Sequence, residues 1–398
     1  MNIEKKLIPL LRFPEYTYAN SFWLENNVGD SIKTLSPPKK LQSNDYKRSG
    51  KYPIIDQSQG FICGYSDDNS AVINKNSKEL IVFGDHTCVL KFIDFPFIQG
   101  ADGIKIFEPK DAAEVDVRYL YQYLVSSQIE SKEYKRHFSE LKEKIFLYPK
   151  TIKEQTKIAD CLFAIDTYIS FTNEKVEQLK AHNRSLLQKL FPQGGKTIPE
   201  YRFPEFEKDG SWEEKELGEL ILEIAEFTSR RNNVPLYSLT IEDGVSPKTD
   251  RYERNFLVKK EGDNFKVVHP DDFVSNPMNL RFGAIGYNKE SFKVCVSGYY
   301  DVFRFKDKGT SSFWINYMKS NWALDMYDRI AIGSLYEKRR VHFSNLLRMK
   351  LLVPKYSERL KISEYLSSME EVIGFYSEKA SLLEQHKKGL MQQLFPKA

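Results

Sequence analysis

Residues 158–192 read IADCLFAIDTYISFTNEKVEQLKAHNRSLLQKLFP, and residues 362–396 read ISEYLSSMEEVIGFYSEKASLLEQHKKGLMQQLFP. The two segments align without a gap at an offset of 204, and 13 of the 35 positions are identical. Small solenoid repeats recur every 20 to 50 residues or so, whereas this spacing indicates two copies of one large unit. The sequence therefore predicts a duplicated architecture.

The repeat extends beyond these segments. RFPEY at 12–16 recurs as RFPEF at 202–206, and HFS at 137–139 recurs as HFS at 342–344. The matches keep their order, so each copy is predicted to contain an entry motif, a variable body, an HFS motif and a long helix. The predicted divisions are a first body (1–150), a first long helix (151–192), a second body (193–353) and a second long helix (354–398).

Apolar residues recur in both long segments at alternating steps of four and three, which is the heptad spacing of a coiled-coil seam. Thr172 and Asn183 interrupt the first seam and Lys387 interrupts the second, while a Leu-Phe-Pro sequence ends each segment. The first predicted seam contains Ile158, Leu162, Ile165, Ile169, Val176, Leu179, Leu186 and Leu190. The second contains Ile362, Leu366, Met369, Ile373, Leu383, Leu390 and Leu394.

A helix from residue 153 to residue 190 would be roughly 57 Å long at about 1.5 Å per residue. Its apolar stripe is too narrow for the inside of a globular core, so it needs one partner of similar length, and the chain provides one. We expect an α+β protein in which two long helices pair as an antiparallel coiled coil with approximate two-fold symmetry. Ordinary bundle helices and a homodimer zipper are the alternatives.

The two bodies are predicted to mix strands and helices, with strands dominant. Residues 79–93, ELIVFGDHTCVLKFI, indicate two strands around a turn, and residues 115–127 have helical spacing. In the second body, residues 294–305 are strand-like and residues 313–330 are helical. Both bodies are therefore expected to be mixed α/β domains.

Bulk properties limit the class of protein. A chain of 398 residues is long enough for two or three domains. It contains no apolar run near the roughly 20 residues that cross a bilayer, and its charged start does not fit a secretory signal. The four cysteines form no CxxC pair, which argues against a zinc site or a disulfide framework. We expect a cytoplasmic protein without a membrane partner.

Charge is balanced in both bodies. Residues 1–150 hold 21 basic and 20 acidic side chains, and residues 193–353 hold 25 and 24. Bulk charge does not indicate a nucleic-acid partner, so DNA binding would require basic groups sorted onto one face. Local basic clusters allow such sorting, and a solvated surface is the alternative for each cluster.

Enzymatic motifs are missing. Residues 276–279, Asn-Pro-Met-Asn, lack the second proline and the aromatic of an amino-methyltransferase loop, and no Walker motif occurs. Pro270-Asp271 is followed by no Glu-x-Lys, and the six histidines have no metal-ligand spacing. We expect no catalytic residue, no metal and no cofactor. His137 and His342 fit either packing or a phosphate contact.

As a set, these motifs resemble the specificity subunit of type I restriction-modification systems over nearly the whole chain. The resemblance rests on RFPEF at 202–206, on the paired segments ending in LFP, and on the lead-in Lys153-Glu154-Gln155 after Pro149. The second lead-in departs from this pattern, because Pro354 is followed by Ser357-Glu358-Arg359, which is one residue closer and lacks the glutamine.

The resemblance implies a non-catalytic subunit with two target-recognition domains. Each domain would read one half of a bipartite site in double-stranded DNA, and the helices would set the spacer and dock two methyltransferase subunits. Restriction/translocase subunits would join through the assembled methyltransferase, which modifies adenine after flipping it from the stack. The alternatives are a stand-alone DNA methyltransferase or nuclease with an unrecognised active site, and a protein-binding adaptor.

Base reading in the major groove requires amide or guanidinium groups that bond two base atoms at once, whereas clustered basic residues suit phosphates. Candidate base readers in the first body are Gln57, Ser58, Gln59, His86, Thr87 and Gln99. Those in the second body are Arg230, Arg231, Ser238, Asn276, Asn279, Arg281 and Tyr287. Phosphate candidates are Lys47, Arg48, Lys135, Arg136, Arg339 and Arg340. For Asn276 and Asn279 the alternative is backbone capping around Pro277.

Overall fold

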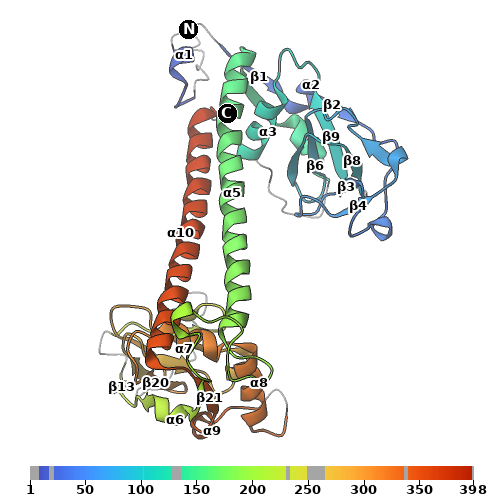
Figure 1. The fold of residues 1–398 in the computed structure, drawn as a ribbon. Coiled ribbons are helices and arrows are strands. Elements are labelled where there is room, and N and C mark those ends of the chain that lie inside the picture. Colours follow the sequence, from blue (N-terminus) through green and yellow to red (C-terminus); the bar gives the residue numbers. More distant parts are fainter. Residues whose placement is uncertain are drawn as a thin grey trace. The chain divides into compact units, whose positions relative to one another are not determined.

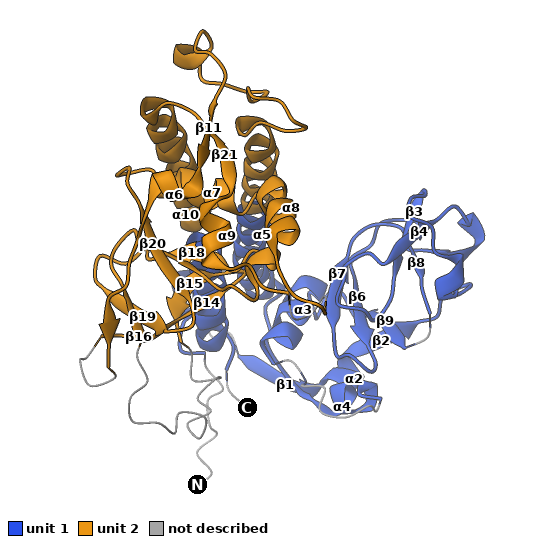
Figure 2. Ribbon diagram, turned by 90° about the horizontal axis from the view of Figure 1, so that it is seen from below, with its two compact units in different colours: residues 1–173, 377–398 blue, residues 174–376 orange. Residues whose placement is uncertain are grey.

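The computed structural model describes residues 9–17, 22–101, 103–127, 129, 136–229, 234–248, 265–335 and 339–396. The chain divides into two compact units. Unit 1 comprises residues 1–173 and 377–398, and unit 2 comprises residues 174–376 (Figure 2). This division cuts both long helices near their middles, whereas we had placed each helix in a segment of its own.

The two long helices form as predicted. Helix α5 spans Ile152–Leu190 and helix α10 spans Tyr356–Leu394, each with 39 residues (Figure 1). In unit 1 the start of α5, at Ile158, shares a core with the end of α10, at Leu394. In unit 2 the end of α5, at Leu190, shares a core with the start of α10, at Ile362. Within each unit the helices therefore pack antiparallel, which confirms the expected direction.

All predicted seam residues are buried or half-buried, as the heptad spacing requires. The polar interruptions are accommodated differently in the two units. In unit 1, Lys387 Nζ donates to both carboxylate oxygens of Asp166, at 2.6 and 2.7 Å. In unit 2, the equivalent Asn183 Oδ1 is buried without a hydrogen-bond partner among the described residues.

The strands in the described part of unit 1 form three sheets. Strand β1 (Trp23–Asn27) pairs antiparallel with β10 (Ile145–Pro149). An antiparallel sheet has the order β2 (Ile32–Leu35), β9 (Ile104–Pro109), β6 (Leu80–Gly84) and β7 (Leu90–Ile93). A third sheet has the order β4 (Gly64–Ser66), β3 (Tyr52–Ile55), β8 (Phe97–Gln99) and β5 (Val72–Ile73), and its β3–β8 pair is parallel.

Helices complete the core of unit 1. Helix α3 (Val117–Ser126) is preceded by the N-cap residue Asp116, whose carboxylate accepts from the backbone N–H groups of Arg118 and Tyr119, as is typical of an N-cap. Its buried face, with Tyr119 and Leu120, packs in one core with the ends of both long helices. The shorter helices are α1 (Pro14–Thr17), α2 (Val28–Ser31) and α4 (Phe138–Glu143).

Unit 2 repeats the same plan with different strands. Strand β11 (Glu213–Glu216) pairs antiparallel with β21 (Lys350–Val353), as β1 does with β10. The larger sheets have the orders β12 (Ile221–Glu223), β20 (Asp301–Phe305), β17 (Phe273–Ser275), β18 (Ile285–Tyr287), and β13 (Phe227–Thr228), β16 (Phe265–Val268), β19 (Val294–Ser297). A hairpin joins β14 (Tyr237–Thr240) to β15 (Gly244–Pro247). The helices are α6 (Leu217–Leu220), α7 (Ser311–Met318), α8 (Asn321–Ile330) and α9 (Phe343–Leu347).

The entry motif explains how each long helix is anchored. Arg12 Nε and Nη2 donate to the two carboxylate oxygens of Glu154 at 2.6 and 2.8 Å. Arg202 makes the same two-pronged contact with Glu358, at 2.8 and 2.6 Å. Both carboxylates lie in the first turn of a long helix and are fully buried. The repeated RFPE motif thus fixes the start of a helix in each unit.

The irregular second lead-in keeps its function with another residue. In unit 1, Gln155 Nε2 donates to the carbonyl oxygen of Pro149 at 2.8 Å. In unit 2, the guanidinium of Arg359 donates to the carbonyl oxygen of Pro354. The missing glutamine therefore leaves the attachment of helix to strand intact.

Among the described residues, no helix combines the length and hydrophobicity that crossing a membrane requires.

Candidate nucleic-acid interface

Residues 56–60 form a surface loop of unit 1, called here the 56–60 loop, which contains three of the candidate base readers. It follows β3, and Asp56 Oδ1 accepts the backbone N–H of Ser58 at 2.8 Å, which is an Asx turn. The turn leaves the side chains of Ser58 and Gln59 exposed. The Ser58 hydroxyl also bonds the Asp56 carboxylate.

The turn between β6 and β7 lies against this loop. Thr87 Oγ1 donates to the carbonyl oxygen of Gln57 at 2.7 Å. Gly84, at the start of the turn, has no room for a side chain, because a Cβ atom would collide with Thr87 Oγ1 and lie 3.1 Å from Gln57 Cβ. Gln57 and Thr87 are in contact, and the half-buried His86 lies in the same turn. Five of the six first-body candidates therefore share one edge of unit 1.

Gln99, the sixth candidate, lies elsewhere. It is only 2% exposed and belongs to β8, which pairs with strands on both sides. A side chain enclosed in this way has no access to a base in this structure. We therefore remove Gln99 from the base readers.

The phosphate candidates of unit 1 lie on the surface. Lys47 and Arg48 are exposed, and Lys47 Nζ forms an ion pair with Asp67 at 2.9 Å. Arg136 is also exposed and precedes His137, whose N–H donates to the carbonyl oxygen of Asp85 at 2.8 Å. That bond places Arg136 beside the β6–β7 turn. Lys135 lies outside the described residues.

The two histidines of the repeated HFS motif, His137 and His342, are buried to different extents. His137 is 1% exposed and its Nδ1 lies 3.2 Å from Glu140 Oε2. His342 is half-buried, and its Nε2 accepts a hydrogen bond from Arg340 Nε at 3.2 Å. The buried position of His137 favours the packing interpretation over a phosphate contact.

In unit 2 the matching surface is the loop Asn276–Gly283. Asn276 Oδ1 accepts the backbone N–H of Met278 at 3.1 Å, so this side chain caps the backbone around Pro277, as the alternative interpretation stated. Asn279 is exposed. The N–H of Val341 donates to the carbonyl oxygen of Pro277 at 2.9 Å, which places the exposed Arg340 beside the loop.

Two arginines of unit 2 serve the fold. Arg281 Nε donates to Asp328 Oδ1 at 2.7 Å and is buried. Arg339 Nη2 donates to the carbonyl oxygens of Asp328 and Ala331 at 2.6 and 3.1 Å. Because both guanidinium groups are bonded to helix α8 and its end, we remove Arg281 from the base readers and Arg339 from the phosphate contacts.

The remaining second-body candidates differ in exposure. Ser238 is half-buried in β14, opposite Ser246. Tyr287 stacks on Phe273 with ring centroids 5.4 Å apart, and burial raises the pKa of its hydroxyl. The hydroxyl thus stays a hydrogen-bond donor at neutral pH. Arg230 and Arg231 lie outside the described residues.

One contributor was missed by sequence reasoning. Lys91 on β7 is 4% exposed, and its ammonium donates to the carbonyl oxygens of Asp56 and Gly60 at 2.9 and 2.6 Å. Burial lowers the pKa of this ammonium. The available signal was a single lysine within the apolar strand Leu90–Ile93, which we had read only as part of a strand.

The long helices carry exposed apolar residues outside the seam. Tyr168 and Phe171 of α5 are 46% and 64% exposed, and Val372 and Phe375 of α10 are 41% and 61% exposed. The two pairs are related by the repeat offset of 204. We call them the midhelix patches, one in unit 1 and one in unit 2.

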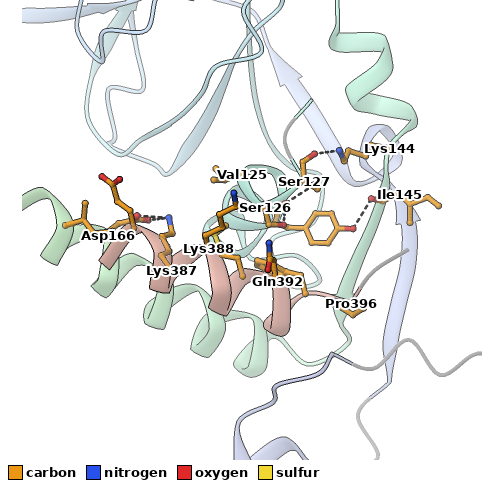
Figure 3. A pocket seen from close by; sticks show the side chains of 15 residues that line it. Val125, Ser126, Ser127, Lys144, Ile145, Asp166, Lys387, Lys388, Gln392 and Pro396 are labelled. Carbon is orange, nitrogen blue, oxygen red and sulfur yellow. Dashed lines mark hydrogen bonds and ion pairs between the residues drawn. The ribbon is translucent and has the colours of Figure 1, made fainter. Parts of the chain in front are cut away.

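Unit 1 also contains a cavity of about 880 Å³ beside α3, the start of β10 and the two long helices (Figure 3). The Lys387–Asp166 ion pair lies at one side of it. Lys144, which donates to the carbonyl oxygen of Ser127, lies at another. Among the described residues, no cluster of three or more His, Cys, Asp or Glu side chains is arranged to hold a metal ion.

Comparisons with known proteins agree with this architecture. Residues 23–181 match the family model described as the type I restriction modification DNA specificity domain. The type I restriction enzyme EcoR124I/EcoR124II specificity subunit of Escherichia coli is 25% identical over 119 residues, which are 29% of this chain and 29% of that protein. The alignment thus spans less than a third of this curated relative.

A solved structure extends the likeness to the whole fold. The S subunit of a type I restriction-modification system from M. genitalium superposes with a TM-score of 0.66 at 14% identity, covering 98% of this chain and 99% of that one. Residues 23–181 therefore resemble the type I restriction modification DNA specificity domain, and the chain as a whole shares the fold of a solved type I S subunit.

Proposed function

We propose that the chain binds double-stranded DNA at a bipartite site and that each unit reads one half. The observation that carries this proposal is similar in both units: an exposed amide side chain and an exposed arginine lie on segments that hydrogen bonds hold together, through the β6–β7 turn in unit 1 and through Pro277 in unit 2. In unit 1 these are Gln59 and Arg136, and in unit 2 they are Asn279 and Arg340. Amides bond two adenine atoms at once in the major groove, and arginines bind phosphates.

The candidate readers are therefore reduced to side chains that reach the surface. In unit 1 they are Ser58 and Gln59, with His86 beside them, and in unit 2 they are Asn279, Ser238 and Tyr287. The long helices join the two reading surfaces, so their length sets the gap between half-sites. Half-sites on one face of DNA are separated by about 34 Å or multiples of it.

We further propose that the chain is non-catalytic and works in the cytoplasm with two methyltransferase subunits. The midhelix patches support two docking sites, because exposed apolar groups mark protein interfaces. Their equivalence within the repeat suits two copies of one partner. Restriction/translocase subunits would bind the assembled methyltransferase, which supplies adenine methylation.

Methylome sequencing tests the reading function. Cells carrying this chain and its cognate methyltransferase as their sole modification system are expected to show one bipartite motif with a fixed gap. Replacing residues 17–136 by another recognition body is expected to change one half of that motif. A change in both halves would contradict independent reading. Methyl transfer or cleavage by the purified chain alone would favour the enzymatic alternative.

Co-purification tests the docking sites. Phe171→Glu and Phe375→Glu each place a carboxylate in one midhelix patch, so each is expected to halve the methyltransferase bound, and the double variant to abolish binding. Leu222→Glu is the matched control, because Leu222 is 51% exposed on β12 and outside the patches. Equal retention of the partner by the double variant and the control would contradict docking at these patches.

A further inference from the structure

The backbone of the 56–60 loop is held from inside the protein. The carbonyl oxygens of Ile54 and Ile55 accept from the N–H groups of Cys63 and Gly100 at 3.1 and 2.9 Å. The next carbonyl, that of Asp56, accepts from Lys91 at 2.9 Å, and that of Gly60 accepts from the same ammonium at 2.6 Å. One buried lysine therefore joins the two ends of the loop.

The middle of the loop has its own support. Thr87 Oγ1 donates to the carbonyl oxygen of Gln57 at 2.7 Å, so the hydroxyl that we had proposed as a base reader is engaged within the protein. A Cβ atom at Gly103 would lie 2.7 Å from Gln57 Oε1, so the Gln57 side chain is closely packed. Within residues 56–60, the polar side chains of the exposed class are those of Ser58 and Gln59.

We propose that Lys91 is a positioning residue for sequence reading by unit 1, with Thr87 as its auxiliary. This inference rests on the proposed DNA-binding function. A base contact requires a fixed donor and acceptor geometry, and a loop that is ordered only on binding loses affinity to that ordering. Lys91 removes this cost by closing the loop before DNA arrives, so that Ser58 and Gln59 meet a base edge in a set orientation.

The placement of charge supports this role over a role in stability alone. An ammonium buried in a strand is expensive unless its hydrogen bonds are satisfied, and a methionine would fill the same volume without that cost. Lys91 donates to two carbonyl oxygens of the loop that presents the readers, and the Asp56 carboxylate of the same loop attracts its ammonium. The lysine is therefore placed to define the shape of the loop.

The test compares half-site discrimination in the assembled complex with methyltransferase. Competition binding would use the duplex motif found by methylation mapping, the same duplex with the unit 1 half scrambled, and the same duplex with the unit 2 half scrambled. Lys91→Met is expected to reduce discrimination at the unit 1 half about tenfold, within the range of one bidentate base contact. Discrimination at the unit 2 half and affinity for unrelated DNA should stay within about twofold of wild type.

Two matched controls separate geometry from folding and from charge. Lys33→Met removes the same charge from the exposed face of β2 and is expected to leave discrimination unchanged. Thr87→Val removes the hydroxyl bond to the loop and should reduce unit 1 discrimination about threefold, as expected for one neutral hydrogen bond. Thr87→Ser keeps the hydroxyl and should restore it. If Lys91→Met does not fold, the Thr87 pair decides the matter.

The outcomes distinguish this inference from the function on which it rests. Suppose that the wild-type complex discriminates both halves. The positioning role is wrong if the discrimination of folded Lys91→Met at the unit 1 half stays within twofold of wild type. If Lys91→Met does not fold, the same criterion applies to Thr87→Val. Equal losses at both halves also overturn it, because they indicate general damage. If the wild-type complex discriminates neither half, the proposed DNA reading itself fails.

Discussion

Replacing Glu358 by Gln should destabilise unit 2 strongly. The change keeps the shape of the side chain but removes its charge. The guanidinium of Arg202 then stays buried without a carboxylate to balance it, since the side chains of Arg202 and Glu358 are only 6% and 1% exposed. Breaking a buried ion pair from one side typically costs about 3–5 kcal/mol. Arg202 Nη1 still donates to the carbonyl oxygens of Asp209 and Gly210, at 2.6 and 3.0 Å, so we expect the lower end, about 3 kcal/mol.

Calorimetry would measure this loss. For a domain of about 200 residues, 1 kcal/mol shifts the midpoint by roughly 2–4 °C, so Glu358→Gln should lower Tm by about 6–12 °C. The matched control is Glu205→Gln, which breaks the Lys361–Glu205 pair, with side chains 46% and 47% exposed. Solvent screens such a pair, so its Tm should equal that of wild type within error.

A double variant separates charge burial from packing. In Arg202→Met/Glu358→Leu both charges are replaced by apolar groups, and such exchanges are often neutral or stabilising. We expect the double variant to regain most of the lost Tm. The reasoning is refuted if Glu358→Gln melts like wild type, or if the double variant is less stable than the single one.

Three further predictions use the same unit or its surface. Gly286→Ala should lower the free energy of unfolding by about 1–3 kcal/mol through overpacking, because its Cβ would lie 2.9 Å from Gly244 Cα. Gly374→Ala, in open space within α10, should instead raise it by about 0.5–1 kcal/mol. Urea titration would contradict this pair of predictions if both variants changed stability in the same direction. Burial raises the pKa of Asp301 to about 6 from 3.8, so the unfolded chain loses this proton first and stability falls as pH rises between these values. Asp301→Asn should remove this loss of stability, which is worth about 1–2 kcal/mol after solvent screening. The measurement is the change in urea midpoint between pH 4 and pH 8, and an equal change in variant and wild type would disprove the prediction. Arg340→Ala should weaken binding to all DNA sequences and reduce the salt slope of log K by about one, whereas an unchanged slope in salt titrations would exclude a phosphate contact.

The long helices were predictable because their signal is local and periodic. Every residue predicted for the seam by the heptad steps is buried or half-buried, and the Leu-Phe-Pro sequences marked the helix ends to within a few residues. Antiparallel packing was inferred from the duplication, and the cores of both units confirm it. The division at 1–150 and 193–353 stays a prediction, since the compact units cut across the helices.

The anchoring contacts were not predictable from one sequence. We had flagged both RFPE and the Lys-Glu-Gln lead-in as motifs, yet nothing local links Arg12 to Glu154, which lie 142 residues apart. Heptad spacing reports which face of a helix is apolar. It does not report which distant charge completes a buried pair.

The candidate base readers stay a prediction, and the sequence did not indicate which of them are neighbours. The structure brings Gln57 and Thr87 into contact through a hydrogen bond that no local pattern signals. Gln99 and Arg281 were misassigned because burial in a strand or loop depends on neighbours far along the chain. A charged side chain looks the same in the sequence whether it faces solvent or, as Lys91 does, carbonyl groups inside the fold.

The way the 56–60 loop is built has a bearing on how new specificities arise. Its main chain is held by the buried Lys91 and the half-buried Thr87, and Ser58 bonds Asp56 within the loop. Under the proposed function, exchanging Gln59 would change the sequence that unit 1 binds and would keep the bonds that Lys91 and Thr87 make to the loop carbonyls. We therefore expect that a new target can arise by a single substitution that leaves the loop folded.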